Sequence, residues 1–115
     1  MYIKKVSPID LAVDLISRST CQVKVAAVLV DNHGIFSWGW NHSGAGYGMH
    51  AEEHCLRRSN RKRWAEATMY VAAARAKKAG LRLVTARPCE DCQRLLNGLR
   101  GRVIYRDKDG LWKGL

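Results

Sequence analysis

The first strong pattern in the chain is a set of apolar residues at helical spacing. The four positions that share one helix face are Ile9, Ala12, Val13 and Ile16. Ser7 suits the N-cap, Pro8 suits the first turn, and Asp10 completes a capping-box-like pair. The sequence therefore predicts an N-terminal helix that lays one apolar stripe on the core.

The next segments are typical of β-strands. Residues 23–30 are rich in β-branched residues, and from Val25 onward both the odd-numbered and the even-numbered positions are apolar. That pattern favours a central strand covered on both faces. A turn over 31–34 and a second strand over 35–41 complete a hairpin.

After the hairpin, helices and strands are expected to alternate. A glycine-rich loop leads to a helix over 51–58, a strand over 68–73, a turn over 75–80 and extended chain over 81–85. Pro88 starts another helix, on which one face carries Cys92, Leu95, Leu96 and Leu99. A strand over 102–105 and a turn over 107–110 precede a short tail. This order predicts one domain over 1–115, a three-layer α/β/α sandwich with a central mixed sheet of about five strands.

Composition narrows the class of protein. The chain has 115 residues, with 47% hydrophobic and 26% charged residues, as in soluble globular proteins. No apolar run reaches membrane-spanning length. Asp10 and Asp14 interrupt the N-terminal region where a signal peptide would be apolar, so we expect a cytoplasmic protein with no membrane partner.

The net charge of +10 arises from 20 Lys and Arg against 10 Asp and Glu. Such an excess favours a polyanion, a phosphorylated small molecule or an acidic partner. The densest basic run spans 57–63, and both a solvated helix end and a phosphate-contacting role are compatible with it.

The four cysteines fall into two groups. Cys21 and Cys55 belong to no motif and are expected as small buried apolar residues. Cys89 and Cys92 form Cys-x-x-Cys, which indicates metal or redox chemistry in a reducing compartment.

A second motif, His50-Ala51-Glu52, supplies an imidazole and a carboxylate. Cys89 and Cys92 share a helix face, and the first turn after Pro88 favours their thiolate forms. Together with His50 they are predicted to bind Zn²⁺ through three protein ligands, which leaves a fourth position for water. Glu52 is not needed as a zinc ligand and is the candidate catalytic residue that carries protons. A purely structural zinc site is the alternative.

A competing motif overlaps the first. His50-Ala51-Glu52-Glu53-His54 also matches H-x-x-E-H, the inverted zinc-protease pattern, with Glu53 as the base. That interpretation leaves Cys89 and Cys92 unexplained, and the chain offers little room for a peptide cleft. We expect His54 to be a packed or exposed helix residue instead.

The chain resembles the cytidine and deoxycytidylate deaminase superfamily. The resemblance runs from the hairpin through Tyr105 and rests on four motifs: 25–30, Gly39-Trp40-Asn41, His50-Ala51-Glu52 and Pro88-Cys89-Glu90-Asp91-Cys92. It implies a five-stranded sheet, zinc held by His50, Cys89 and Cys92, and Glu52 as the proton shuttle of a hydrolytic deamination.

The resemblance also implies substrate contacts. Asn41 corresponds to an asparagine that contacts sugar or base, and the backbone N–H of Ala51 would bond the base carbonyl. Arg87 stands directly before Pro88, where family members commonly have a small or acidic residue. Its side chain would contact either a substrate phosphate or solvent.

Aromatic residues near the motifs have two expected roles. If Asn41 faces the site, strand alternation turns Trp38 and Trp40 to the opposite face, as core or interface residues. His42 and Tyr47, in the loop leading to His50, are candidates for stacking on a base.

Two departures from the family pattern bear on function. The segment 74–86 is longer than the usual link to Pro-Cys, and the C-terminal covering helices of many relatives are not seen. We therefore expect a homo-oligomer. The favoured substrate is a free cytosine nucleoside or nucleotide. A deaminase acting on single-stranded nucleic acid and a non-catalytic zinc-stabilised nucleic-acid-binding module are the alternatives.

Overall fold

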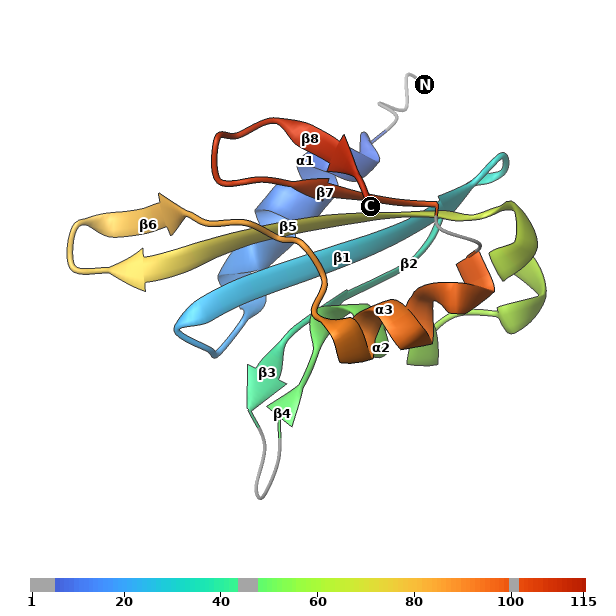
Figure 1. Ribbon diagram of the computed structural model, residues 1–115, viewed down its shortest axis with the longest axis horizontal. Helices are drawn as coiled ribbons and strands as arrows, with labels where there is room; N and C mark the ends of the chain where they lie inside the picture. The colour runs from blue at the N-terminus through green and yellow to red at the C-terminus, as the bar shows by residue number, and fades with distance from the viewer. Residues whose placement is uncertain (1–5, 44–47, 100–101) are drawn as a thin grey trace, which may run out of the picture.

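A six-stranded sheet forms the centre of the molecule and helices lie on both of its faces (Figure 1). The computed structural model describes residues 6–43, 48–99 and 102–115. The strands of this sheet are β1 (Val23–Asp31), β2 (Gly34–Trp40), β5 (Thr68–Lys77), β6 (Gly80–Leu83), β7 (Val103–Arg106) and β8 (Trp112–Gly114). They lie in the order β2-β1-β5-β7-β8, with β6 paired to β5. β5 and β7 are parallel and the other pairs are antiparallel, so the predicted mixed sheet is confirmed.

The helices complete the three predicted layers. α1 (Pro8–Leu15), extended by a 3₁₀ turn (Ile16–Arg18), covers one face. α2 (Ala51–Arg57) and α3 (Glu90–Leu95) cover the other, where a further 3₁₀ turn (Leu96–Leu99) follows α3. A third 3₁₀ segment (Arg61–Glu66) links α2 to β5. No helix among the described residues is long and apolar enough to cross a membrane.

β1 is the central strand that its apolar pattern predicts. Ala27 and Leu29 are buried in the core beneath α2 and α3, whereas Ala26 and Val28 are buried in the core beneath α1. All four side chains are inaccessible to solvent. The absence of polar alternation in this strand is thus explained by helices on both faces.

Two helical stripes differ in detail from the prediction. Ser7 caps α1 by accepting a hydrogen bond from the Asp10 N–H, as expected, but Val13 is exposed and Leu15 is buried in its place. In the α3 region, Cys92, Leu96 and Leu99 are buried while Leu95 faces solvent. The buried face thus runs from Cys92 to Leu96, four residues on in α3 and its C-cap, and then to Leu99, three residues on in the 3₁₀ turn.

The turn predicted over 75–80 is confined to residues 78–79, and the prediction is wrong for 75–77. β5 continues to Lys77 and turns at Gly80, which has a φ of 121°, into β6. Val23 pairs with Arg75 on one side of β5 and Arg82 pairs with Arg75 on the other. The predicted C-terminal tail is likewise a strand, β8, which pairs antiparallel with β7.

Candidate active site

His50 is delivered to the site by two short strands. β3 (His42–Ser43) and β4 (Gly48–Met49) pair with each other and flank residues 44–47. The glycine-rich loop predicted before His50 is therefore flanked by two strands that pair with each other. Tyr47, the candidate for base stacking, lies outside the described residues. His50 is the N-cap residue of α2, and its extended backbone turns the chain from β4 into the helix.

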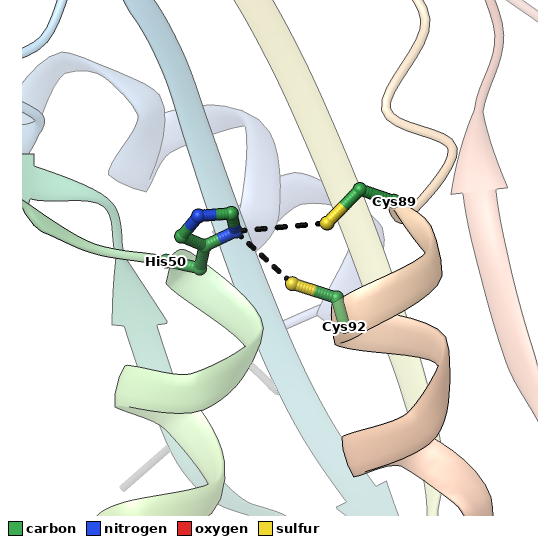
Figure 2. Close-up of side chains that lie close together, drawn as sticks. All are labelled: His50, Cys89 and Cys92. Atoms are coloured by element: carbon green, nitrogen blue, oxygen red, sulfur yellow. Dashed lines mark hydrogen bonds between the residues drawn. The ribbon is translucent and has the colours of Figure 1, made fainter.

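The structure brings the three predicted zinc ligands together (Figure 2). Nδ1 of His50 lies 3.1 Å from Sγ of Cys92 and 3.9 Å from Sγ of Cys89. The ligand atoms all lie within 4.8 Å of one another. Tetrahedral zinc with ordinary Zn–S and Zn–N bonds separates a nitrogen and a sulfur ligand by about 3.6 Å. The two observed separations bracket that value, so the group fits a single zinc ion.

The chemistry of the two sulfurs also suits a metal. All four cysteines are free, so Cys89 and Cys92 are not joined in a disulfide. Burial raises the pKa of the Cys92 thiol, and the nearby charge of Glu52 raises it further. For Cys92, the expectation that the helix start favours the thiolate is therefore wrong before a metal binds, and zinc binding would release the Cys92 proton.

Glu52 lies two residues beyond His50, in the first turn of α2, and is buried, with 5% of its surface exposed. Burial raises the pKa of its carboxyl group, while its own backbone N–H, His50 and Cys92 act in the opposite direction. A buried carboxyl group beside a metal site has the proton-accepting and proton-donating capacity that hydrolysis needs. Glu52 is not a member of the metal-ligand group, and its role in carrying protons stays a prediction.

A cleft of about 450 Å³ opens over these residues. Its lining includes His50, Glu52 and Cys89. β1 contributes Val23 and Val25 to the same cleft. The sequence analysis did not identify these apolar walls, because a strand residue at the rim of a cleft has the same pattern as a core residue.

Asn41 follows β2 and lines the cleft. Its carboxamide also forms hydrogen bonds to neighbouring segments of the chain. Oδ1 accepts hydrogen bonds from the Ser19 hydroxyl at 2.6 Å and the Val25 N–H at 2.8 Å. Nδ2 donates to the Val23 carbonyl at 2.7 Å. This structural role was not foreseen, and the contact between Asn41 and substrate stays a prediction.

Ala51 and Arg87 both line the cleft; Ala51 directly follows His50, and Arg87 lies two residues before Cys89. Ala51 is buried at the first turn of α2. Arg87 is exposed, and its backbone N–H donates to the Thr85 hydroxyl at 3.3 Å. Both positions are compatible with the substrate contacts implied by the resemblance, which stay predictions.

His54 packs against aromatic side chains and is absent from the metal-ligand group. Its Nδ1 accepts a hydrogen bond from the Trp40 N–H at 3.2 Å, and its ring meets those of Trp40 and His42 edge-on. Burial lowers the pKa of His54. The inverted zinc-protease interpretation is therefore wrong, since the structure pairs His50 with the sulfurs.

The remaining candidates have mixed outcomes. Trp40 packs against the α1 core as expected, while Trp38 is 39% exposed under the guanidinium of Arg58. Cys55 is fully buried as predicted, and burial raises its pKa to about 12. Cys21 is half-buried on the wall of the cleft, so its expected burial is wrong.

A family model and solved structures of similar fold both match this chain. The family model for the cytidine and deoxycytidylate deaminase zinc-binding region matches residues 4–106. The fold is similar to that of cytidine deaminase from Burkholderia pseudomallei, with 20% identity, a TM-score of 0.69, and coverage of 94% of this chain and 88% of that one. Cytidine deaminase from Mycobacterium leprae gives 17% identity, a TM-score of 0.57, and coverage of 91% and 87%.

A search of curated proteins gave no significant match. The family match extends over most of the chain and includes the residues that converge in the cleft. The chain therefore belongs to the cytidine and deoxycytidylate deaminase family and is a zinc-dependent deaminase.

Proposed function

We propose that the protein hydrolyses the exocyclic amino group of cytosine in a nucleoside or nucleotide, which yields the uracil form and ammonia. The observation that carries this proposal is the buried carboxyl group of Glu52 beside the His50–Cys89–Cys92 group, at the bottom of an open cleft. A structural zinc site has no use for such a carboxyl group.

His50, Cys89 and Cys92 would hold the zinc ion. When bound there, zinc acts as a Lewis acid that lowers the pKa of a water molecule. Two thiolates offset much of the metal charge, so the carboxylate of Glu52 has a larger share in activating the water than in a site with three neutral ligands.

Glu52 carries the protons of the reaction. Its carboxylate accepts a proton as the water oxygen forms a bond to C4 of cytosine, and it delivers that proton to N3. The second proton of the water then passes through the same carboxylate to the amino group. The C4–N bond breaks, ammonia leaves, and C4 is left with a carbonyl oxygen.

The cleft has the size and the polar groups to position a nucleoside. A volume of about 450 Å³ falls within the usual range of small-molecule sites. In this proposal the Ala51 N–H binds the base carbonyl, Asn41 contacts the sugar or base through its remaining N–H, and Arg87 meets a phosphate at the entrance. The arginine favours a nucleotide over a nucleoside.

A screen for ammonia release tests the proposal directly. Zinc-loaded protein would be incubated with cytosine, cytidine, deoxycytidine, and their monophosphates, with the adenine series as a matched comparison. We expect release from cytosine nucleosides or nucleotides and none from the adenine compounds. Preference for adenine, or no release from any compound at full zinc occupancy, would contradict the proposal.

A further inference from the structure

A second cavity, of about 360 Å³, lies beside the β5–β6 hairpin. We call it the basic groove, and its lining residues are Arg75, Lys77, Arg82, Leu83, Val84, Thr85 and Lys108. Four of these seven residues are basic and none is acidic. The groove therefore concentrates positive charge outside the metal site.

The four cations of the groove lack acidic partners. None of the ion pairs found within residues 6–43, 48–99 and 102–115 involves Arg75, Lys77, Arg82 or Lys108. Nε of Arg75 is buried without a hydrogen-bond partner among these residues. A cavity lined by basic side chains without acidic partners has N–H donors available to bind an anion.

Nearby acids offset only part of the positive charge of the groove. Asp107 and Asp109 flank Lys108 in sequence, but both pair with Lys113, at 2.8 Å and 3.2 Å. These two carboxylates share one ammonium group, and Asp107 also accepts a hydrogen bond from the Thr85 side chain, so together they leave one net negative charge near the four cations of the groove.

The basic run at 57–63 behaves differently, although it is denser in sequence. Arg57 pairs with Glu53, Arg63 pairs with Asp31, and Arg61 lies over the ring of Trp64. Most basic side chains of that run therefore already interact with acidic or aromatic groups of the protein, whereas the more dispersed cations of the groove have no acidic partner.

Arg75 and Arg82 are direct partners across the β5–β6 hairpin. Like charges directly opposite each other destabilise a β-ladder. A bound anion between them would remove that repulsion, so their arrangement is better suited to a liganded state.

The groove adjoins the active-site cleft. Thr85 lines both cavities, and the chain from Val84 to Arg87 runs from one to the other. In Figure 1 this segment is the orange trace that leaves β6 and crosses to α3. Val23, on the wall of the cleft, pairs directly with Arg75. A row from Val23 through Arg75 to Arg82 thus joins cleft and groove across three strands.

We propose that the basic groove binds the phosphodiester backbone of single-stranded nucleic acid whose unpaired cytosine occupies the active-site cleft. This inference rests on the proposed deaminase function for the identity of the base. Arg87 suffices for the phosphate of one nucleotide at the entrance, and the four further cations fit the successive phosphates of a strand. The strand must be single because a paired base cannot enter the cleft.

Binding of a labelled single-stranded DNA with one central cytosine, measured by fluorescence anisotropy, tests the groove without turnover. Each protein is full-length and zinc-loaded and carries Glu52→Gln. Arg75→Gln/Arg82→Gln is compared with Arg61→Gln/Lys62→Gln, which removes the same charge from the 3₁₀ segment after α2. Salt is varied between about 50 and 200 mM, where phosphate contacts are strongly salt-dependent.

We expect the groove variant to weaken DNA binding and to reduce the slope of log affinity against log salt by about 1.4, since each phosphate contact on a single strand contributes about 0.7. The control variant should bind within about twofold of the parent. Equal weakening in both variants, no weakening in the groove variant, or no binding by the parent would overturn the proposal. Equal affinity for a duplex of the same sequence would overturn it as well.

A charge reversal separates a role in binding from a role in folding. Arg82→Glu places a carboxylate opposite Arg75, so the melting temperature should rise by about 1–5 °C while DNA binding falls. A simultaneous loss of stability and binding would indicate a merely structural arginine.

Turnover distinguishes this inference from the proposed function. With Glu52 intact, Arg75→Gln/Arg82→Gln should lower kcat/KM for the oligonucleotide and leave deamination of free cytidine unchanged. If neither substrate is deaminated by the parent protein but the groove still binds DNA, the proposed chemistry fails and the groove stands. Loss of activity on free cytidine in the groove variant would count against the groove.

Discussion

Gly39 of β2 lies directly against the backbone of Cys55 in α2. A Cβ atom at position 39 would lie 2.6 Å from the Cys55 nitrogen and 3.0 Å from the Ala51 carbonyl oxygen. No side chain fits at that distance, because backbone atoms cannot move aside as a flexible side chain can. The glycine lets α2 approach the sheet closely enough to place His50 and Glu52 in the lining of the cleft.

Gly39→Ala should therefore displace α2 and lower the free energy of unfolding by about 1–3 kcal/mol, the usual cost of overpacking a tight contact. Because His50 and Glu52 move with the helix, ammonia release should fall too. Urea unfolding and an activity assay measure both effects. Gly114→Ala, where no atom lies within 4 Å of the added methyl group, is the matched control and should change neither.

Asn41→Ala should cost stability as well as activity. The substitution removes the carboxamide that accepts from Ser19 and Val25 and donates to Val23. Leaving such groups unsatisfied costs about 1–3 kcal/mol. If the variant unfolds at the parent's urea midpoint, these three hydrogen bonds do not contribute as the structure implies.

Cys89→Ala should lose zinc and lose the stability that depends on zinc. Metal analysis and thermal melts would be run with and without a chelator. The melting temperature of the variant should lie below that of the zinc-loaded parent, and the two should converge once the chelator is present. Cys21→Ala is the control and should retain zinc, since Cys21 is outside the metal-ligand group.

The Asp31–Arg63 ion pair should make stability depend on pH in the acid range. The hydrogen bond from the Arg63 guanidinium, at 2.7 Å, lowers the pKa of Asp31 from 3.8 to about 2. A carboxyl group with a depressed folded-state pKa stabilises the fold above its ordinary pKa, and that contribution is lost as the pH falls from about 4 through 2.

Urea midpoints between about pH 2 and 5 measure this effect. Arg63→Gln should flatten the acid limb of the stability curve, because Asp31 then titrates near its ordinary value in both states. The limb should not vanish, since Lys113 lowers the pKa of Asp107 to about 2 in a similar way. An unchanged acid limb in the variant would show that the Asp31–Arg63 pair is not its source.

The sequence predicted the elements that carry strong local signals. The apolar pattern of β1 and the cap at Ser7 are local, and the structure confirms both. Segment 75–77 was missed as a strand because its alternation of alanine with basic residues has little β propensity. Pairing with Val23 and with β6 outweighs that local preference.

The candidate site was foreseen for a different reason. Thiol, imidazole and carboxylate groups keep their chemical identity wherever the chain places them, so their motifs could be read before the fold was known. The second role of Asn41 and the shared lining of cleft and groove at Thr85 depend on contacts between distant segments, which no local sequence pattern predicts. Cytoplasmic location and homo-oligomeric assembly stay predictions.

Glu52→Gln tests the central claim most directly, because it removes the proton-carrying carboxylate and keeps the shape of the side chain. Zinc content and ammonia release from the best cytosine substrate would be measured together, beside Glu53→Gln. Glu53 is the neighbouring residue, and it pairs with Arg57 at the surface. We predict that Glu52→Gln retains zinc and the fold but releases no ammonia, whereas Glu53→Gln behaves as the parent. Parent-like ammonia release by zinc-loaded Glu52→Gln would contradict the account.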